Sequence, residues 1–541
     1  MKKMWTAGRI ASVAMLCGLG MGDGHAQSTN AGDIRGSATD ATGALLPDVA
    51  VTVTNLDTGV TKQLKTNRDG LYDTSSIVVG TYSVKFEKEG FETFERTGIT
   101  LQVGFSTVNA KLKIGNVTQE VVVNSDIPLL TTESGEQSTT FDSKSMEQLP
   151  NVSSGTNGPD WQSFTILLPG SSGAPQGANS STNPGQVVAI NGNLPYSNVL
   201  ADGASSTLSH SANADVSIFE TVAELQVNTS AFSAQYGIGG VIFNQISKGG
   251  TNDFHGSLYE YFQTDKLNAY NYGFRTPSAN LTKNRLRYDD FGGTVGGPVR
   301  IPKLFNGKDK AFFFFGYDQI VNHGTGQNST QTVPTETVKA GDFTGQSLIY
   351  DPTTQTIAHD AAGNPYPLRK TFLSEYGVNA IPAGLFDKVS ANFQKLYPTP
   401  TNHIAGGQFI PGSVNNVGLL QNNFISFQRQ STPVRRYFGR FDYNITPSQR
   451  LSMSDTQRDV PVVYPASITP CPIGCQNGDV DSNNAQITEE WTISPRTINE
   501  VRMGFTYQGN FYTDQTIGQG LPGQLGWQFA KADSLPSVQF N

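Results

Sequence analysis

Apolar and polar side chains alternate along much of the chain beyond residue 253, which is the pattern of β-strands with two unlike faces. The clearest run carries Tyr437, Gly439, Phe441, Tyr443 and Ile445 on one face, and Arg436, Arg440, Asp442 and Asn444 on the other. The pattern recurs in Val501, Met503, Phe505 and Tyr507 against Arg502, Gly504 and Thr506, and in Phe291, Val295 and Val299 against Tyr288, Asp290 and Thr294. Arginines at alternate positions would be costly in a dry core but not in a water-filled lumen. The pattern therefore favours the wall of a transmembrane β-barrel over a large soluble sandwich.

Seven strands follow from this pattern, and the connections between them differ in length. We predict strands at 254–263, 286–299, 310–322, 434–445, 450–459, 486–493 and 498–509. Tight turns are predicted at Asn306-Gly307, Thr446-Pro447-Ser448 and Ser494-Pro495-Arg496, whereas the connections at about 264–285, 323–433 and 460–484 are long. Short turns at one rim and long loops at the other are typical of outer-membrane barrels.

Residues 27–115 predict a separate small β-sandwich, because short strands and turn signals alternate at intervals of roughly ten residues. The ordered motifs are Ile34-Arg35-Gly36, Gly43, Pro47-Asp48-Val49, Thr58-Gly59, Thr66-Asn67, Asp69-Gly70-Leu71-Tyr72, Gly80-Thr81-Tyr82 and Gly90-Phe91. This set resembles the carboxypeptidase regulatory-like domain. The resemblance implies a carbohydrate-binding-like, transthyretin-like fold without peptidase activity. A structural module and a sugar-binding module both remain open.

Residues 116–252 change to a Ser-, Thr-, Asn- and Gly-rich composition with apolar islands, and a short helix is predicted within 141–150. The ordered segments are 218–227, Ala234-Gln235-Tyr236-Gly237, 239–244 and Ser247-Lys248-Gly249-Gly250-Thr251-Asn252. They resemble the end of the plug of a TonB-dependent receptor where it runs into the first barrel strand. The closest resemblance is to Oar-like transporters, which carry the same regulatory-like domain. It implies ligand capture by long extracellular loops and plug apices, with the protein TonB as a partner that displaces the plug.

A β-branched segment precedes the plug and includes Gln119, Glu120, Val121, Val122 and Val123. It resembles the TonB box, which could add to the sheet edge of TonB through backbone hydrogen bonds. A last strand of the sandwich and an ordinary plug strand remain equally open alternatives.

The first 26 residues have the pattern of a secretory signal peptide: a basic start, a short apolar run at 10–20, and Gly24-His25-Ala26 as a cleavage site. The run is too short for a spanning helix. Leu16 before Cys17 is a poor match for a lipoprotein signal. The resemblance implies the outer membrane of a Gram-negative bacterium after export.

Composition narrows the function classes. Charged residues make up 15% of the chain, Gly numbers 57 and the formal net charge is −8. These values exclude long charged coiled coils and argue against nucleic-acid binding. We predict no catalytic, cofactor-binding or metal-binding residues, and no enzyme activity. Cys471 and Cys475 form a short Cys-x-x-x-Cys segment, for which a local disulfide is favoured over a metal site.

The predicted fold class is therefore all-β dominated: a small β-sandwich, an α+β plug domain, and an incomplete antiparallel transmembrane β-barrel over 253–541. Plugged transporters have 22 strands, so we expect this chain to be the N-terminal half of a longer protein. The expected function is TonB-dependent uptake of a bulky polar nutrient, with an oligosaccharide as one candidate. The alternative is a secreted carbohydrate-binding or adhesive β-protein.

Overall fold

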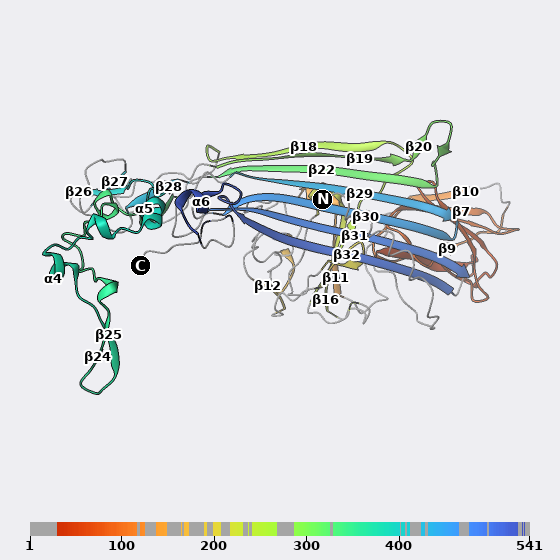
Figure 1. Ribbon diagram of the computed structural model, residues 1–541. Helices are drawn as coiled ribbons and strands as arrows, with labels where there is room; N and C mark the ends of the chain where they lie inside the picture. The colour runs from red at the N-terminus through yellow and green to blue at the C-terminus, as the bar shows by residue number, and fades with distance from the viewer. Residues whose placement is uncertain are drawn as a thin grey trace.

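The computed structural model describes most of the chain beyond residue 29. The described residues are 30–115, 120–124, 137–148, 164, 167–172, 189–191, 198–206, 217–230, 236, 241–267, 286–324, 328–400, 402–405, 408–411, 423–427, 431–464, 475–494, 497–528, 533 and 535. The predicted signal peptide lies outside them. Strands dominate the three successive parts, as the sequence predicts (Figure 1).

The first part is a sandwich of two sheets. One sheet has the order β4-β1-β5, with β8 and β9 also paired to β1, and the other has the order β10-β7-β6-β2-β3. The bounds are β1 Ala31–Thr39, β2 Ala50–Asn55, β3 Thr61–Lys65, β4 Leu71–Asp73, β5 Ile77–Val78, β6 Gly80–Glu87, β7 Thr93–Leu101, β8 Gly104–Thr107, β9 Ala110–Lys111 and β10 Glu120–Asn124. Val51 and Val53, two residues apart on β2, are 1% exposed and pack with Phe86 between the sheets.

The second part is built around a five-stranded sheet of order β11-β16-β17-β14-β15, called here the plug sheet. The bounds are β11 Gln137–Asp142, α2 Ser143–Gln148, β12 Ser171–Ser172, β13 Ala189–Ile190, β14 Asn198–Ala201, β15 Ala204–Ser205, η3 Phe219–Thr221, β16 Val222–Ser230 and β17 Ile242–Ser247. Asp142 caps the predicted helix by accepting a hydrogen bond from the Ser145 amide (2.6 Å). Met146 on this helix packs with Leu225 and Phe243 of the sheet.

The third part is one seven-stranded antiparallel sheet, called here the wall, in which each strand pairs with the next. Its strands are β18 His255–Thr264, β19 Leu286–Pro298, β22 Ala311–Gly324, β29 Ser431–Thr446, β30 Gln449–Tyr464, β31 Gln476–Ser494 and β32 Thr497–Asp514. All seven predicted strands are confirmed. Tyr437, Phe505 and Val295 on the predicted apolar face are 40%, 51% and 43% exposed. β18 and β32 are the two edges of the sheet, so the described strands do not close into a barrel.

The two ends of the wall differ as predicted. The connections β29–β30 and β31–β32 are each two residues long, and this end is called here the short-turn rim. The sandwich lies at this rim, and the described part of the longest connection, residues 328–400, lies at the opposite end (Figure 1). A short hairpin of β20 Arg300–Ile301 and β21 Phe305–Asn306 lies between β19 and β22, and β12 pairs with β13 in the plug region. The predicted tight turn at Asn306-Gly307 is wrong, because Asn306 pairs with Arg300 within this hairpin.

The longest connection forms a lobe of short elements. They are β23 Asn328–Gln331, α3 Glu336–Lys339, η5 Pro352–Thr354, β24 Thr356–His359, β25 Pro365–Leu368, α4 Phe372–Tyr376, η6 Ala383–Leu385, α5 Lys388–Gln394, β26 Asn402–Ala405, β27 Gln408–Pro411 and β28 Phe424–Phe427. α5 packs against α6 Leu521–Leu525, which follows the last wall strand, through Phe393 and Leu525. No helix in the described part of the chain is both long and apolar enough to cross a membrane.

Candidate functional site: the contact between plug and wall

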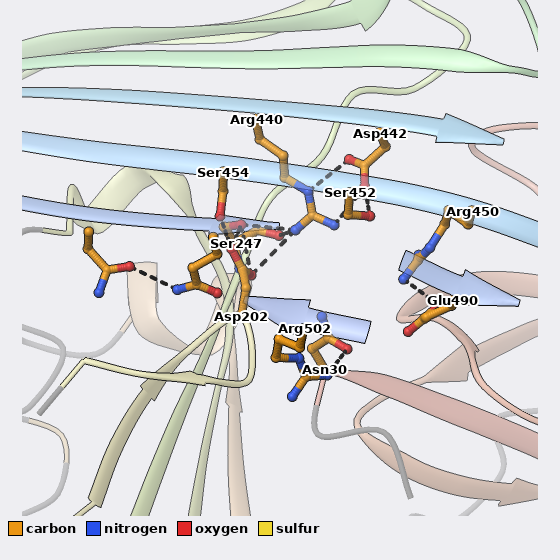
Figure 2. Close-up of polar contacts among 12 residues, drawn as sticks. Asn30, Asp202, Ser247, Arg440, Asp442, Arg450, Ser452, Ser454, Glu490 and Arg502 are labelled. Atoms are coloured by element: carbon orange, nitrogen blue, oxygen red, sulfur yellow. Dashed lines mark hydrogen bonds and ion pairs between the residues drawn. The ribbon is translucent and has the colours of Figure 1, made fainter. Parts of the chain in front are cut away.

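The polar face of the wall meets the plug sheet through Arg440 of β29 (Figure 2). Its guanidinium donates two hydrogen bonds to the carboxylate of Asp442, from Nε to Oδ2 (2.8 Å) and from NH2 to Oδ1 (3.1 Å). Its NH1 donates to the backbone oxygen of Ser247 at the end of β17 (2.8 Å). The Arg440 side chain is 8% exposed. A charge-assisted hydrogen bond between two buried groups stabilises the fold. Removing one partner leaves the other charge buried and unpaired, which is strongly destabilising.

Asp202 brings the plug side of this contact to Arg440. It begins the two-residue turn Asp202-Gly203 between β14 and β15, with φ values of 44° and 80°. Asp-Gly suits such a hairpin because both residues tolerate the left-handed conformation. The Asp202 carboxylate accepts hydrogen bonds from the Ser247 amide (2.8 Å) and from Ser454 Oγ of β30 (2.9 Å). Its Oδ1 also lies 3.5 Å from Arg440 NH1.

Further contacts hold the same two surfaces together. Arg436 NH1 donates to the Ser217 backbone oxygen (3.0 Å), and Arg502 NH1 donates to the Gly203 backbone oxygen (2.8 Å). Tyr261 of β18 donates from its hydroxyl to Glu220 of η3. An apolar contact lies beside them and consists of Ile218, Phe314 and Phe438. The plug is therefore fixed to five of the wall strands: β18, β22, β29, β30 and β32.

This arrangement corrects one expectation about the wall. The alternating arginines were predicted to face a water-filled lumen. Arg436 and Arg440 do lie on the face opposite Tyr437, but they are buried under the plug and pair with it. The plug covers this part of the polar face, so the desolvation of each guanidinium is offset by carboxylates and carbonyls.

The predicted TonB-box segment lies in the sandwich, away from this contact. Glu120–Asn124 form β10, which pairs in parallel with β7 at the edge of the sheet. Val121 aligns with Phe94, and Val123 with Arg96. The segment is thus a strand of the sandwich sheet, one of the alternatives that the sequence left open. Gln119 lies outside the described residues, and TonB binding by the segment stays a prediction.

The predicted disulfide is described at one of its two cysteines. Cys475 is 1% exposed and disulfide-bonded. Cys471 lies outside the described residues, so the pairing of Cys471 with Cys475 stays a prediction.

Sequence analysis missed the residues that join plug to wall. Asp202 follows the apolar island Val199-Leu200-Ala201, and Asp-Gly at that point signals a hairpin. That signal predicts the turn but not its partner, because Arg440 lies 238 residues further along the chain. A charged residue in a hairpin turn is usually solvated, so nothing local distinguishes Asp202 from other turn aspartates.

Two family models match the chain. The outer membrane beta barrel domain matches residues 246–541, and the carboxypeptidase regulatory-like domain matches residues 33–113. The chain is 27% identical over 277 residues to the TonB-dependent transporter Oar of Myxococcus xanthus. That match covers 50% of this chain and 25% of Oar, so the chain spans about a quarter of the length of this curated relative.

Two solved structures show partial similarity to this chain. The outer membrane transporter YddB of Escherichia coli has a TM-score of 0.42 and 9% identity, over 70% of this chain and 40% of YddB. A mutant of the ferric enterobactin receptor PfeA of Pseudomonas aeruginosa has a TM-score of 0.34 and 11% identity, over 70% of this chain and 41% of PfeA. These matched proteins are transporters and receptors, not enzymes. Both TM-scores are below 0.5, so the assignment rests on the family model, which covers more than half of the 541 residues. The chain belongs to the outer membrane beta barrel domain family.

Proposed function

We propose that the protein acts as a TonB-dependent outer-membrane receptor that takes up a bulky polar nutrient, with an oligosaccharide as the favoured class. The observation that carries this proposal is the plug sheet seated on the polar face of the wall through Arg440 and Asp202. Hydrogen bonds and ion pairs of this kind hold a plug firmly, yet a pulling partner can break them one after another. The relative Oar bears the name of a TonB-dependent transporter.

The sandwich and the loops support the choice of ligand class. The regulatory-like domain resembles carbohydrate-binding-like folds, and the lobe at the long-loop end exposes aromatic side chains such as Tyr350 and Tyr366. Aromatic faces on a polar surface suit sugar rings, which present apolar C–H groups beside their hydroxyls. The competing ligand classes are siderophores and peptides, and the uptake experiment below distinguishes them from oligosaccharides.

The test is uptake by Gram-negative cells that express the full gene product containing this chain. Labelled oligosaccharides should enter cells that contain TonB and should only bind the surface of cells that lack it. Val121→Pro removes a backbone N–H that strand addition to TonB needs, so uptake should fall to the level of TonB-deficient cells. The conservative Val121→Ile is the control and should retain uptake.

Each contrary outcome has a separate meaning. Siderophore or peptide uptake that depends on TonB, with no oligosaccharide uptake, would replace the ligand class and keep the transporter. Uptake independent of TonB, or recovery of the protein from the medium with no membrane association, would contradict the proposed function and favour the adhesive alternative.

A further inference from the structure

The sandwich contacts the short-turn rim through the turn between β2 and β3. Asn252, just before β18, donates from its backbone amide to the Asp57 oxygen (3.0 Å) and from Nδ2 to the Thr58 oxygen (2.6 Å). Asn252 also bonds to Asp309, which precedes β22, through Nδ2 (2.6 Å). The approach is close at Gly59, where a β-carbon would lie 2.5 Å from Asp309 Oδ1. A side chain at this position would displace the Asp309 and Asn252 side chains, and its φ of +69° is in the left-handed region that favours glycine.

A second set of contacts joins β3 and the β4–β5 turn to the wall strand β31. Lys62 Nζ lies 3.3 Å from Thr492 Oγ1, and Ser76 Oγ lies 3.3 Å from Glu490 Oε1. Glu490 also pairs with Arg450 of β30 (2.9 Å). Burial lowers the pKa of Lys62, and the nearby carboxylate of Glu490 acts against that shift. A lysine desolvated at such a junction indicates a closed interface, since a free sandwich would leave it in water.

A third contact joins the sandwich to the plug directly. The Val103 amide, between β7 and β8, donates to Glu224 Oε1 of β16 (3.1 Å). Glu224 is 4% exposed. Burial raises its pKa to about 7, the Val103 amide opposes that shift, and the facing Asp142 adds to it. The sandwich therefore contacts the plug as well as the rim of the wall.

A cavity of about 310 Å³ lies where sandwich, plug and wall meet. Tyr82 and Lys62 of the sandwich line it, together with Ala223 and Ile246 of the plug and Arg440 of the wall. We propose that the sandwich is a cap that docks on the short-turn rim, covers this face of the plug, and must undock before anything leaves past the plug on this side. Its part in transport rests on the proposed function, whereas the docking itself does not.

β10 gives this cap a mechanical link. β10 pairs with β7, and Val103, which follows β7 in the chain, is hydrogen-bonded to Glu224 of the plug. A force applied to β10 therefore acts on the sandwich before it acts on the plug sheet.

The test measures how fast a cysteine placed under the cap reacts with a maleimide, without ligand or TonB. Ala223→Cys is introduced into the full chain in detergent micelles, and the chain without it gives the background. Gly59→Ala should make this cysteine react about tenfold faster, because the added methyl group displaces the Asp309 and Asn252 side chains from their rim contact and so opens the docked state more often. Gly90→Ala is the matched control: its φ is +84°, but a β-carbon there meets nothing within 4 Å. It should react at the parent rate.

A second pair of variants removes dependence on one glycine. Lys62→Met should also speed the reaction, whereas Lys65→Met, on an exposed position of the same strand, should not. Hydrogen exchange at Val84 in the sandwich core shows whether the sandwich of each variant is folded. If Gly59→Ala does not fold, the Lys62→Met variant alone tests the proposal. Parent rates for folded Gly59→Ala and Lys62→Met would overturn the cap, and they would leave uptake through TonB untouched.

Discussion

The plug and the sandwich are both attached to the wall, but the chemistry of the two attachments differs. The plug contact contains a buried guanidinium and two carboxylates, Arg440, Asp442 and Asp202, with side-chain exposures of 8%, 13% and 13%. The sandwich contact consists of single hydrogen bonds, in each of which at least one partner is neutral. The Asn252 amide donates to the carbonyls of Asp57 and Thr58, and the Lys62 ammonium donates to the Thr492 hydroxyl. Breaking the plug contact leaves buried charges without their partners, whereas breaking the sandwich contact exposes its hydrogen-bonding groups to water, which can replace the lost bonds.

This difference predicts an order of release. A hydrogen bond between neutral groups at the rim is worth about 1 kcal/mol, whereas the buried Arg440 guanidinium makes several charge-assisted bonds at once. Thermal motion should therefore break the rim contacts more often than the plug contact. The sandwich should therefore detach from the rim while the plug stays seated on the wall. Each prediction below alters one side of this comparison.

The largest effect is expected for Arg440→Met. The substitution leaves Asp442 and Asp202 buried without a cation, which should cost about 3–5 kcal/mol in the free energy of opening the plug from the wall. Hydrogen exchange of the β17 amides in detergent micelles measures that opening. Arg369→Met is the matched control, because Arg369 is exposed in the long-loop lobe and bonds to Gln355. It should change the value by less than about 0.5 kcal/mol.

Adding Asp202→Asn to Arg440→Met should restore part of the loss, because it removes one of the stranded charges. Equal exchange in Arg440→Met and Arg369→Met would mean that the charged contact does not hold the plug, and the proposed order of release would be wrong.

The next effect concerns Glu224, where plug and sandwich meet. Its pKa of about 7 lies above the ordinary value of 4.5. Between these values the unfolded chain releases the proton while the native chain keeps it, so raising the pH favours unfolding. The free energy of unfolding should fall by on the order of 3 kcal/mol from about pH 4.5 to pH 7 and then level off.

Glu224→Gln isolates this effect from other titrating groups. The variant should lose the pH dependence that Glu224 contributes, so the two curves should meet at low pH and diverge as the pH rises, with the variant the more stable. Urea unfolding of the β16 region across this pH range measures it. Parallel curves would show that Glu224 is solvated in the native protein.

The wall strands could be predicted from the sequence because successive residues of each strand face different environments, one apolar and the other polar. Tyr437 and Phe505 had to be apolar and Arg436 polar, and this alternation fixed strand and face together. The pattern weakened beyond the apolar band. β31 begins at Gln476 rather than at residue 486, and the apolar residues Val480 and Ala485 among residues 476–485 do not alternate with polar ones in the two-residue pattern of a strand. Pairing with β30 and β32 continues the strand there without an apolar face.

The contacts of the plug and the cap could not be predicted in the same way. Asp202 and Arg440 are far apart in sequence, and so are Thr58 and Asn252. A hydrogen bond from a side-chain amide to a backbone carbonyl can be accepted by any residue type, so the identity of the accepting residue does not indicate the contact. Gly59 did leave one, as a member of the regulatory-like motif, but a glycine in a turn ordinarily indicates only the turn.

The smallest effect is expected for Asn252→Ala. It removes the Nδ2 hydrogen bonds to Thr58 and Asp309 while the backbone bond to Asp57 remains. Docking of the sandwich should weaken by about 1 kcal/mol, since the freed carbonyl can bond to water.

Asn499→Ala is the control, because Asn499 lies near the same rim and bonds to Glu489 within the wall. In the maleimide assay at Ala223→Cys, Asn252→Ala should react about fivefold faster than Asn499→Ala. Exchange at β17 should be equal in the two, because the plug is held by the charged contact that neither variant touches. If Asn252→Ala changed hydrogen exchange at β17 as much as Arg440→Met does, the sandwich and the plug would move together, and the two attachments would not be independent.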